Sequence, residues 1–282
     1  MNLAALRCFH AVVEQGSVLA AARTLHRVPS NVSTRLRQLE DELGTTLFER
    51  GGRRLAPNAA GTTLYGYAQR ILALCEEARS AVRPAQDCGE LRLGSMESTA
   101  ASRLPGLLSR LHARLPELVV ELRTDSTAAL LAQLRDGMLD AAFVADFVPD
   151  AELDGCAVFD EALVIVAPAS HRPIASAGDV AGDTLLSFAA GCAYRDRLWR
   201  WVDHARHKAL ELTSYHAIIA CVASGTGVAL VPRSVLDTVA ARDGVAVYPL
   251  GGPLGRSTTS LVWRRDDTSP RHAALLGALA AD

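Results

Sequence analysis

A regular alternation of 4- and 3-residue spacings between residues 64 and 82 constrains the fold of this chain more than any other feature. Its apolar positions are Leu64, Ala68, Ile71, Cys75, Ala78 and Val82. This period is typical of a long helix with one narrow apolar seam. Asn58 is suited to cap its start, and Arg83-Pro84 ends it. We expect the seam to pair with a second copy of the chain, or else to pack on the core of its own domain.

The residues before this helix predict a small helical domain over 1–58. An apolar face at Leu3, Leu6, Phe9 and Val13 indicates a first helix, Gly16 is suited to cap its end, and Ser17 is suited to begin a second. Pro29 is typical of the first turn of a third helix, which Gly44 ends. In that helix we expect one buried stripe, made by Val32, Leu36, Leu39 and Leu43. The segment 47–55, with Gly51-Gly52 at its centre, predicts a small hairpin.

Two helices separated by Gly/Pro turns, the second polar on one face, are typical of a helix-turn-helix. The polar face carries Ser30, Asn31, Ser33, Thr34, Arg35, Arg37 and Gln38. These side-chain types read base edges and bind phosphates, although an ordinary solvated face has a similar composition. Arg53 and Arg54 at the hairpin tip are further candidates for phosphate or minor-groove contacts. Residues 1–60 carry eight arginines and five acids, so a basic head precedes an acidic body, as in many proteins that bind nucleic acid.

After residue 90 strands alternate with helices, which predicts an α/β body with a largely parallel sheet. The expected strands cover 91–94, 118–122, 141–145, 163–167, 184–188, 227–231 and 260–263. Such sheets bind ligands at the carboxyl ends of their strands. Residues between 84 and 90 are a candidate linker, so we expect three parts: 1–58, 59–88 and 89–282.

The order of residues in the head resembles the winged helix-turn-helix of LysR-type transcriptional regulators. The matching positions run from Phe9 through Gly16-Ser17, Ala21-Ala22 and Leu25, then Ser30-Asn31-Val32-Ser33, Leu39-Glu40, Leu43-Gly44, Leu47-Phe48 and Arg50. The resemblance implies a long dimerising linker helix and a two-lobed effector domain like a periplasmic binding protein. We expect lobe I at about 89–161 and 264–282, and lobe II at about 162–263. Pro29 departs from the family pattern, which has a polar residue there that contacts DNA, and Asn58 replaces the usual threonine.

The resemblance also implies partners. They are double-stranded operator DNA, a second copy of the chain as a dimer or a dimer of dimers, and a small-molecule effector. We expect the effector between the lobes, where hydroxyls and helix starts follow strands. The candidate residues are Ser95, Glu97, Ser98, Thr99, Ser126, Thr127, Cys192, Tyr194, Arg195 and His216. Helix capping, surface ion pairing and structural hydrogen bonding are the alternative roles for these side chains. If Glu97 and Arg195 both face the cleft, an amino acid or a related metabolite would satisfy the two charges.

Other classes of protein find little support in the sequence. No G-x-S-x-G elbow, P-loop or H-E-x-x-H motif occurs, so we do not predict an enzyme, a metal site or a cofactor. Two alternatives remain besides the enzyme: a binding protein without DNA activity, and a redox-responsive regulator that uses Cys192 beside Arg195. No apolar run is long enough to span a membrane, and the first residues do not resemble a signal peptide, so we expect a cytoplasmic protein.

Overall fold

The computed structural model describes residues 1–49, 55–81, 89–202, 207–239, 244–267 and 270–279. They form two compact units, the head (Met1–Arg83, with Asp136–Met138) and the body (Pro84–Arg135 and Leu139–Asp282). No described helix has the length and apolar character needed to cross a membrane.

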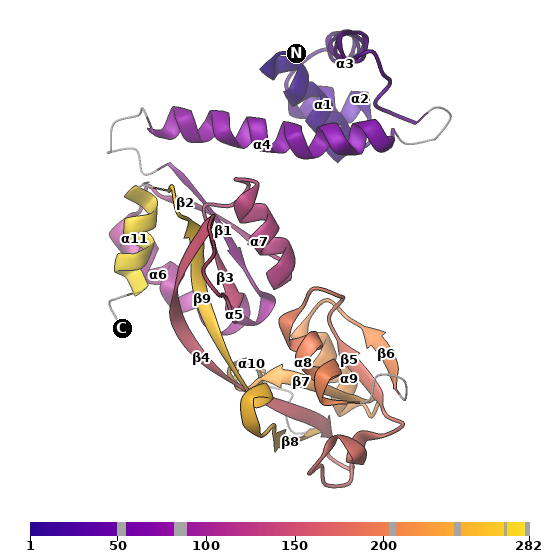
Figure 1. Ribbon diagram of the computed structural model, residues 1–282, viewed down its shortest axis with the longest axis vertical. Helices are drawn as coiled ribbons and strands as arrows, with labels where there is room; N and C mark the ends of the chain where they lie inside the picture. Colours follow the sequence, from indigo (N-terminus) through magenta and orange to yellow (C-terminus); the bar gives the residue numbers. More distant parts are fainter. Residues whose placement is uncertain (50–54, 82–88, 203–206, 240–243, 268–269, 280–282) are drawn as a thin grey trace. The chain divides into compact units, whose positions relative to one another are not determined.

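The described residues of the head form four helices: α1 (Leu3–Gln15), α2 (Val18–Thr24), α3 (Pro29–Leu43) and α4 (Ala59–Ala81) (Figure 1). The predicted caps are confirmed. Gly16 ends α1 at φ 64°, a left-handed conformation that favours glycine, and the Ser17 hydroxyl accepts the Ala20 N–H at 3.4 Å. Gly44 ends α3 in the same way at φ 67°.

The core of the head joins all four helices. Val32, Leu36 and Leu39 of α3 are buried with Phe9 of α1 and Ala68 of α4. The expectation that Leu43 completes the stripe is wrong, because this side chain is 41% exposed. It lies in the last turn of α3, which extends beyond the packed core.

Backbone pairing and a helix cap hold the chain between α3 and α4. Phe48 and Pro57 form an isolated antiparallel bridge, and residues 50–54, including Arg53 and Arg54, lie outside the described part of the chain. Asn58 caps α4 as predicted, accepting the Gly61 N–H at 2.9 Å. A Cβ at Gly61 would lie 2.0 Å from the Leu47 carbonyl oxygen, so this close approach requires glycine.

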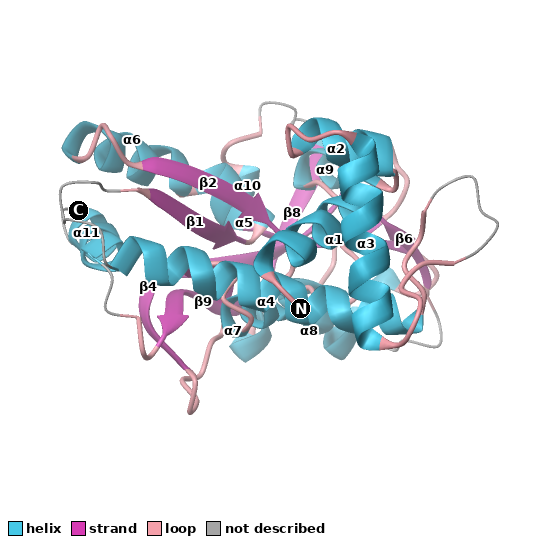
Figure 2. Ribbon diagram, turned by 90° about the horizontal axis from the view of Figure 1, so that it is seen from above, coloured by secondary structure: helices cyan, strands magenta, loops and turns pink. Residues whose placement is uncertain are grey.

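Lobe I of the body is a sheet with strand order β2-β1-β3-β9-β4. Its strands are β1 (Glu90–Ser95), β2 (Val119–Thr124), β3 (Ala141–Ala145), β9 (Arg256–Arg264) and the first part of β4 (Leu153–Pro168). Its helices are α5 (Glu97–Ser102), α6 (Leu104–Arg114), α7 (Thr127–Arg135) and α11 (Pro270–Leu279). Figure 2 shows β1 and β2 side by side in the same direction, as their parallel register requires.

Lobe II continues from the second part of β4 in the order β4-β7-β5-β6, with β8 also on β4. Its strands are β5 (Thr184–Ser187), β6 (Lys208–Glu211), β7 (Val228–Pro232) and β8 (Val245–Pro249). Its helices are α8 (Ala193–Trp201), α9 (Tyr215–Ala223) and α10 (Arg233–Leu236), with short 3₁₀ turns at Ala177–Val180 and Gly252–Gly255. The chain therefore passes between the lobes twice, within β4 and just before β9.

Two expectations about the body need correction. The sheet is mixed rather than largely parallel, because β9 and β4 run antiparallel to each other and to β3 and β7 respectively. The boundary of lobe II at residue 263 also departs from the structure. Strand β9 pairs along its length with β4 and with β3, so it belongs to the sheet of lobe I.

Candidate functional site

The polar face of α3 is displayed as the sequence predicts. Ser30, Asn31, Ser33, Thr34 and Arg37 are exposed, and Arg35 is half-buried. The Arg35 Nε donates to Asn31 Oδ1 at 3.0 Å, which orders two of these side chains along one edge of the helix. The face thus combines hydroxyl, amide and guanidinium groups on a single rigid helix.

The apolar seam of α4 is divided between two environments. Ala68 is buried in the core of the head, and Leu64 and Ile71 pack against that core. Cys75 is half-buried and Ala78 is exposed, whereas Val82 lies outside the described residues. Tyr67 and Leu74 add exposed apolar side chains, with 58% and 64% of their surface accessible. The first half of the seam therefore packs on the core of its own domain instead of being free to pair with a second copy of the chain.

In the body, the carboxyl ends of four parallel strands border one cavity of about 340 Å³. Residues 96–98 follow β1, 124–127 end and follow β2, 188–190 follow β5, and 212–213 follow β6. The first two groups come from lobe I and the last two from lobe II, and the starts of α8 and α9 complete the wall. The lining residues are Met96, Glu97, Ser98, Thr124, Asp125, Ser126, Thr127, Phe188, Ala189, Ala190, Cys192, Ala193, Tyr194, Leu212, Thr213 and Tyr215.

Six of the ten candidate effector residues line this cavity: Glu97, Ser98, Ser126, Thr127, Cys192 and Tyr194. Four do not. Ser95 and Thr99 are buried beneath the wall, and the Ser95 hydroxyl donates to the Met96 carbonyl at 2.9 Å. His216 is exposed on α9.

Arg195, the fourth, is held away from the cavity. Its Nη1 donates to Glu211 Oε1 at 2.5 Å and to the Phe188 carbonyl at 3.2 Å. The proposed pairing of Glu97 and Arg195 around one ligand is therefore not the arrangement seen here. Arg195 forms the ion pair that was its alternative role.

Glu97 makes a polar contact across the cleft. Its Oε1 accepts the backbone N–H of Tyr215 in lobe II at 3.3 Å. Its Oε2 is buried and accepts no hydrogen bond from the described residues. Burial raises the pKa of this carboxyl, against the opposing effects of the Tyr215 N–H, the positive charge of His216 and the Ser214 hydroxyl.

Two further lining groups are kept neutral by burial. Desolvation raises the pKa of the Cys192 thiol, even though the backbone N–H groups of Tyr194 and Arg195 act in the opposite direction. Desolvation also raises the pKa of Tyr194 to about 12. A thiol with a raised pKa is a poor nucleophile at neutral pH, so the environment of Cys192 does not favour redox sensing.

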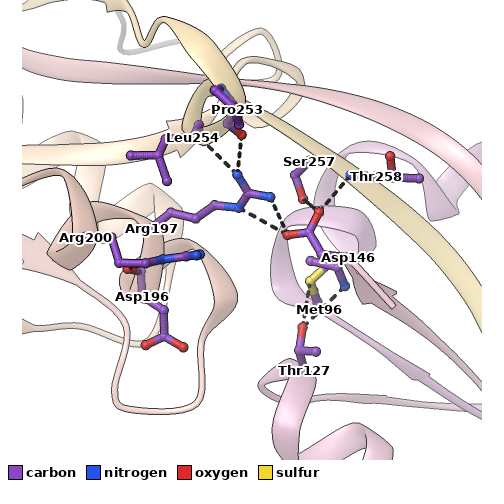
Figure 3. Close-up of polar contacts among 11 residues, drawn as sticks. Met96, Thr127, Asp146, Asp196, Arg197, Arg200, Pro253, Leu254, Ser257 and Thr258 are labelled. Atoms are coloured by element: carbon purple, nitrogen blue, oxygen red, sulfur yellow. Dashed lines mark hydrogen bonds and ion pairs between the residues drawn. The ribbon is translucent and has the colours of Figure 1, made fainter. Parts of the chain in front are cut away.

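A second polar network, built on Arg197 of α8, joins the lobes next to the cavity (Figure 3). Arg197 is 9% exposed, and its guanidinium donates to Asp146 Oδ2 through Nη2 at 2.6 Å and through Nε at 3.1 Å. Its Nη1 donates to the Pro253 carbonyl at 2.8 Å and to the Leu254 carbonyl at 3.2 Å. Asp146, which follows β3 in lobe I, also accepts the Ser257 hydroxyl at 3.1 Å and the Thr258 N–H at 3.2 Å through Oδ1.

Ten of the sixteen lining residues were not among the predicted effector residues. Thr124 and Asp125 end and follow a predicted strand, so the rule that placed Ser126 there should also have included them. Leu212 and Thr213 follow β6, whose four residues are all exposed and show no apolar pattern. The aromatic pair Phe188 and Tyr215, with ring centroids 4.8 Å apart, depends on the meeting of two segments that only the fold brings together.

Comparisons with known proteins agree with this architecture. Residues 3–62 match the family described as bacterial regulatory helix-turn-helix protein, lysR family, and residues 84–282 match the LysR substrate binding domain. The HTH-type transcriptional regulator YusT of Bacillus subtilis, whose own role is uncharacterized, is 35% identical over 93% of this chain and 89% of its own.

Solved structures show the same fold. A full-length variant of OxyR from Pseudomonas aeruginosa has a TM-score of 0.72 and 26% identity, over all of this chain and 95% of its own. Full-length CbnR in complex with its target DNA has a TM-score of 0.71 and 23% identity, over 99% of each chain.

The chain belongs to the LysR family of transcriptional regulators. It is a DNA-binding regulator with a helix-turn-helix head and an effector-binding body of two α/β lobes.

Proposed function

We propose that α3 reads operator DNA in the major groove through Ser30, Asn31, Ser33, Thr34, Arg35 and Arg37. The observation that carries this proposal is the exposure of these side chains opposite a stripe that anchors α3 in the head core. Arginine recognises guanine edges, asparagine recognises adenine, and hydroxyls bind phosphates. Arg53 and Arg54 are proposed to contact phosphate or the minor groove.

Replacing Arg37 with alanine tests this assignment. We expect a loss of about 1–3 kcal/mol of operator binding and relaxed specificity at one base, because the exposed guanidinium is suited to a base or phosphate contact. The measurement is a gel shift on the DNA upstream of the protein's own gene. Arg200→Ala is the matched control, because it removes one positive charge from an exposed position on α8 in the body. Equal affinity of the Arg37 and Arg200 variants would exclude Arg37 from the contact.

The protein is proposed to act as a homodimer, or as a dimer of dimers, through α4. The proposal is based on the exposed part of the helix, because the head core is packed by Leu64, Ala68 and Ile71. Tyr67, Ile71, Leu74 and Ala78 follow each other at spacings of 4, 3 and 4, and the first, third and fourth are exposed. Cys75 and Val82 belong to the same expected seam.

A small molecule in the cavity between the lobes is proposed to control the protein. Its wall comes from both lobes, so a bound ligand favours the lobe arrangement that gives it more contacts. Such coupling is typically about 1–3 kcal/mol, enough to alter how paired heads hold DNA. As a DNA-binding regulator, the protein is expected to act in the cytoplasm.

A further inference from the structure

The described wall of the cavity contains acids but no basic side chain. Glu97 and Asp125 both line it, whereas none of the sixteen described lining residues is a lysine, arginine or histidine. Arg123, Arg195 and His216 each adjoin a lining residue in sequence, but the two arginines are paired with Glu121 and Glu211, and His216 is exposed on α9. The cavity therefore favours a positively charged ligand over a carboxylate.

The two acids differ in how fully their carboxylate oxygens are hydrogen-bonded. Asp125 Oδ1 accepts the Ser126 N–H at 2.7 Å, and its Oδ2 accepts Gln133 Nε2 at 3.0 Å. Oε1 of Glu97 accepts the Tyr215 N–H at 3.3 Å, and its Oε2 is buried without a hydrogen-bond partner among the described residues. A buried carboxylate oxygen without a donor is costly, so Glu97 is the acid that gains most from a ligand.

The Glu97 carboxyl is able to meet a donor in the cavity. The terminal torsion of a glutamate is broad, so a small rotation brings the unpartnered oxygen toward a group that enters beside it. A donor that carries a positive charge forms a shorter and stronger hydrogen bond with a carboxylate than a neutral donor does.

The rest of the wall fits an apolar body. The ring centroids of Phe188 and Tyr215 lie 4.8 Å apart at an interplanar angle of 53°, and Met96, Ala189 and Ala190 line the same cavity. Aromatic faces also attract organic cations. A cavity of about 340 Å³ is at the small end for ligand sites.

We propose that the effector is a small organic ammonium ion whose charged nitrogen binds the Glu97 carboxylate and whose apolar or aromatic body contacts Phe188 and Tyr215. This inference rests on the proposed control of the protein through the cleft and specifies the chemistry of the ligand there.

Matched probes test the inference on the full chain. One set is 2-phenylethylamine, 2-phenylethanol and phenylacetate, and the other is butylamine, butanol and butanoate, each measured by titration calorimetry at neutral pH. In at least one set we expect the amine to bind at least 10-fold more tightly than its alcohol, and the carboxylate to bind most weakly. A carboxylate that binds as tightly as its amine would overturn the inference, and so would two amines that bind no better than their alcohols.

The Glu97→Gln variant tests whether the preference for the amine depends on the Glu97 side chain. This near-isosteric change keeps an oxygen for the Tyr215 N–H and removes the charge, so we expect the preference for the amine to fall below about 3-fold. Glu117→Gln removes the same charge from an exposed position outside the cavity wall, and should keep the full preference. An amine preference that persists in folded Glu97→Gln protein, as judged by its melting curve, contradicts the assignment.

The result is separable from the test of the proposed function. A carboxylate probe that binds and changes the footprint on DNA would overturn the ammonium inference and leave control through the cleft intact. The opposite outcome is an amine that binds through Glu97 in a protein whose DNA footprint does not change when the two lobes are covalently linked. That outcome would support the ligand class and contradict control through the cleft.

Discussion

At the residue scale, we propose that Glu97 combines a binding role with a cost to stability. Its carboxyl lies at the start of α5, accepts one backbone N–H across the cleft, and leaves one oxygen buried without a partner among the described residues. Functional sites commonly contain groups that the folded protein alone does not satisfy. Glu97 is such a group, and its cost should be measurable without any ligand.

The sign of the pH effect at Glu97 follows from its raised pKa. The folded state favours the protonated carboxyl, so this residue destabilises the protein increasingly as pH rises from about 4.3, the ordinary glutamate value, through the higher pKa of the folded state. We expect Glu97→Gln to melt higher than wild type at neutral pH, by roughly 2–4 °C if the net gain is about 1 kcal/mol.

Differential scanning calorimetry between pH 4 and pH 8 measures this difference. The difference in melting temperature between wild type and Glu97→Gln should shrink as pH falls, because the wild-type carboxyl becomes protonated in both the folded and unfolded states. A wild-type protein that is more stable than Glu97→Gln at pH 8 would show that the carboxylate is well satisfied.

At the scale of elements, Arg197 attaches α8 to Asp146 of lobe I. Arg197→Ala removes four hydrogen bonds to Asp146, Pro253 and Leu254 and leaves their oxygens with fewer donors. We expect a loss of about 2–4 kcal/mol in the free energy of unfolding, since the guanidinium is largely buried and charge-paired. Urea unfolding of the full chain provides the measurement.

Arg200→Ala is the matched control for this element. Arg200 lies further along the same helix, is exposed, and its Nε donates only a 3.3 Å bond to the Asp196 carbonyl. The effect of its loss on stability should stay within about 0.5 kcal/mol. Equal losses in the two variants would mean that Arg197 does not join the lobes in solution.

The exposed part of α4 gives a test of assembly. Leu74→Glu places a charge on the exposed apolar face without disturbing the head core, whereas Ile71 packs against that core. We expect the variant to sediment as a monomer at concentrations where wild type is a dimer, because a charge buried at the interface is strongly unfavourable. Unchanged sedimentation, with circular dichroism showing intact helices, would place the dimer contact elsewhere.

The sequence predicted elements wherever local signals were strong. The caps at Gly16, Ser17, Gly44 and Asn58 depend on neighbouring residues alone and were found. The sixteen residues of β4 were only partly recognised, since its first ten residues alternate irregularly between exposed and buried positions in the strand that joins the lobes. Leu43 fitted the helical period but lies in the terminal turn, where the tertiary fold decides burial.

The candidate site was predictable to the extent that it follows strand ends. Six lining residues came from that rule, whereas Arg195 was misplaced because its partner Glu211 ends a strand with no sequence signal. The importance of Arg197 also depends on Asp146, which lies 51 positions away in the chain. Pairings at this separation come from topology rather than from local patterns.

For the whole molecule, we propose that the relation between the two lobes controls how paired heads hold DNA. The lobes approach closely at one point that permits a covalent restraint. A Cβ at Gly191 in lobe II would lie 3.6 Å from the Ser126 Cβ in lobe I, within the range of about 3.5–4.5 Å that disulfides require. Gly191 has φ 94°, so a cysteine there is strained, but equally so in the oxidised and reduced forms.

The most direct measurement is therefore a DNase footprint on the upstream DNA with the Ser126→Cys, Gly191→Cys protein, in a Cys192→Ser background that removes the neighbouring thiol. Wild type and the Ser126→Cys, Cys192→Ser protein, treated with the same oxidant and reductant, are the controls and should not change. Our account predicts that oxidation of the paired variant alters the footprint or the DNA bend, with less than about a 10-fold change in affinity. Identical footprints and bends for its oxidised and reduced forms would contradict control through the cleft.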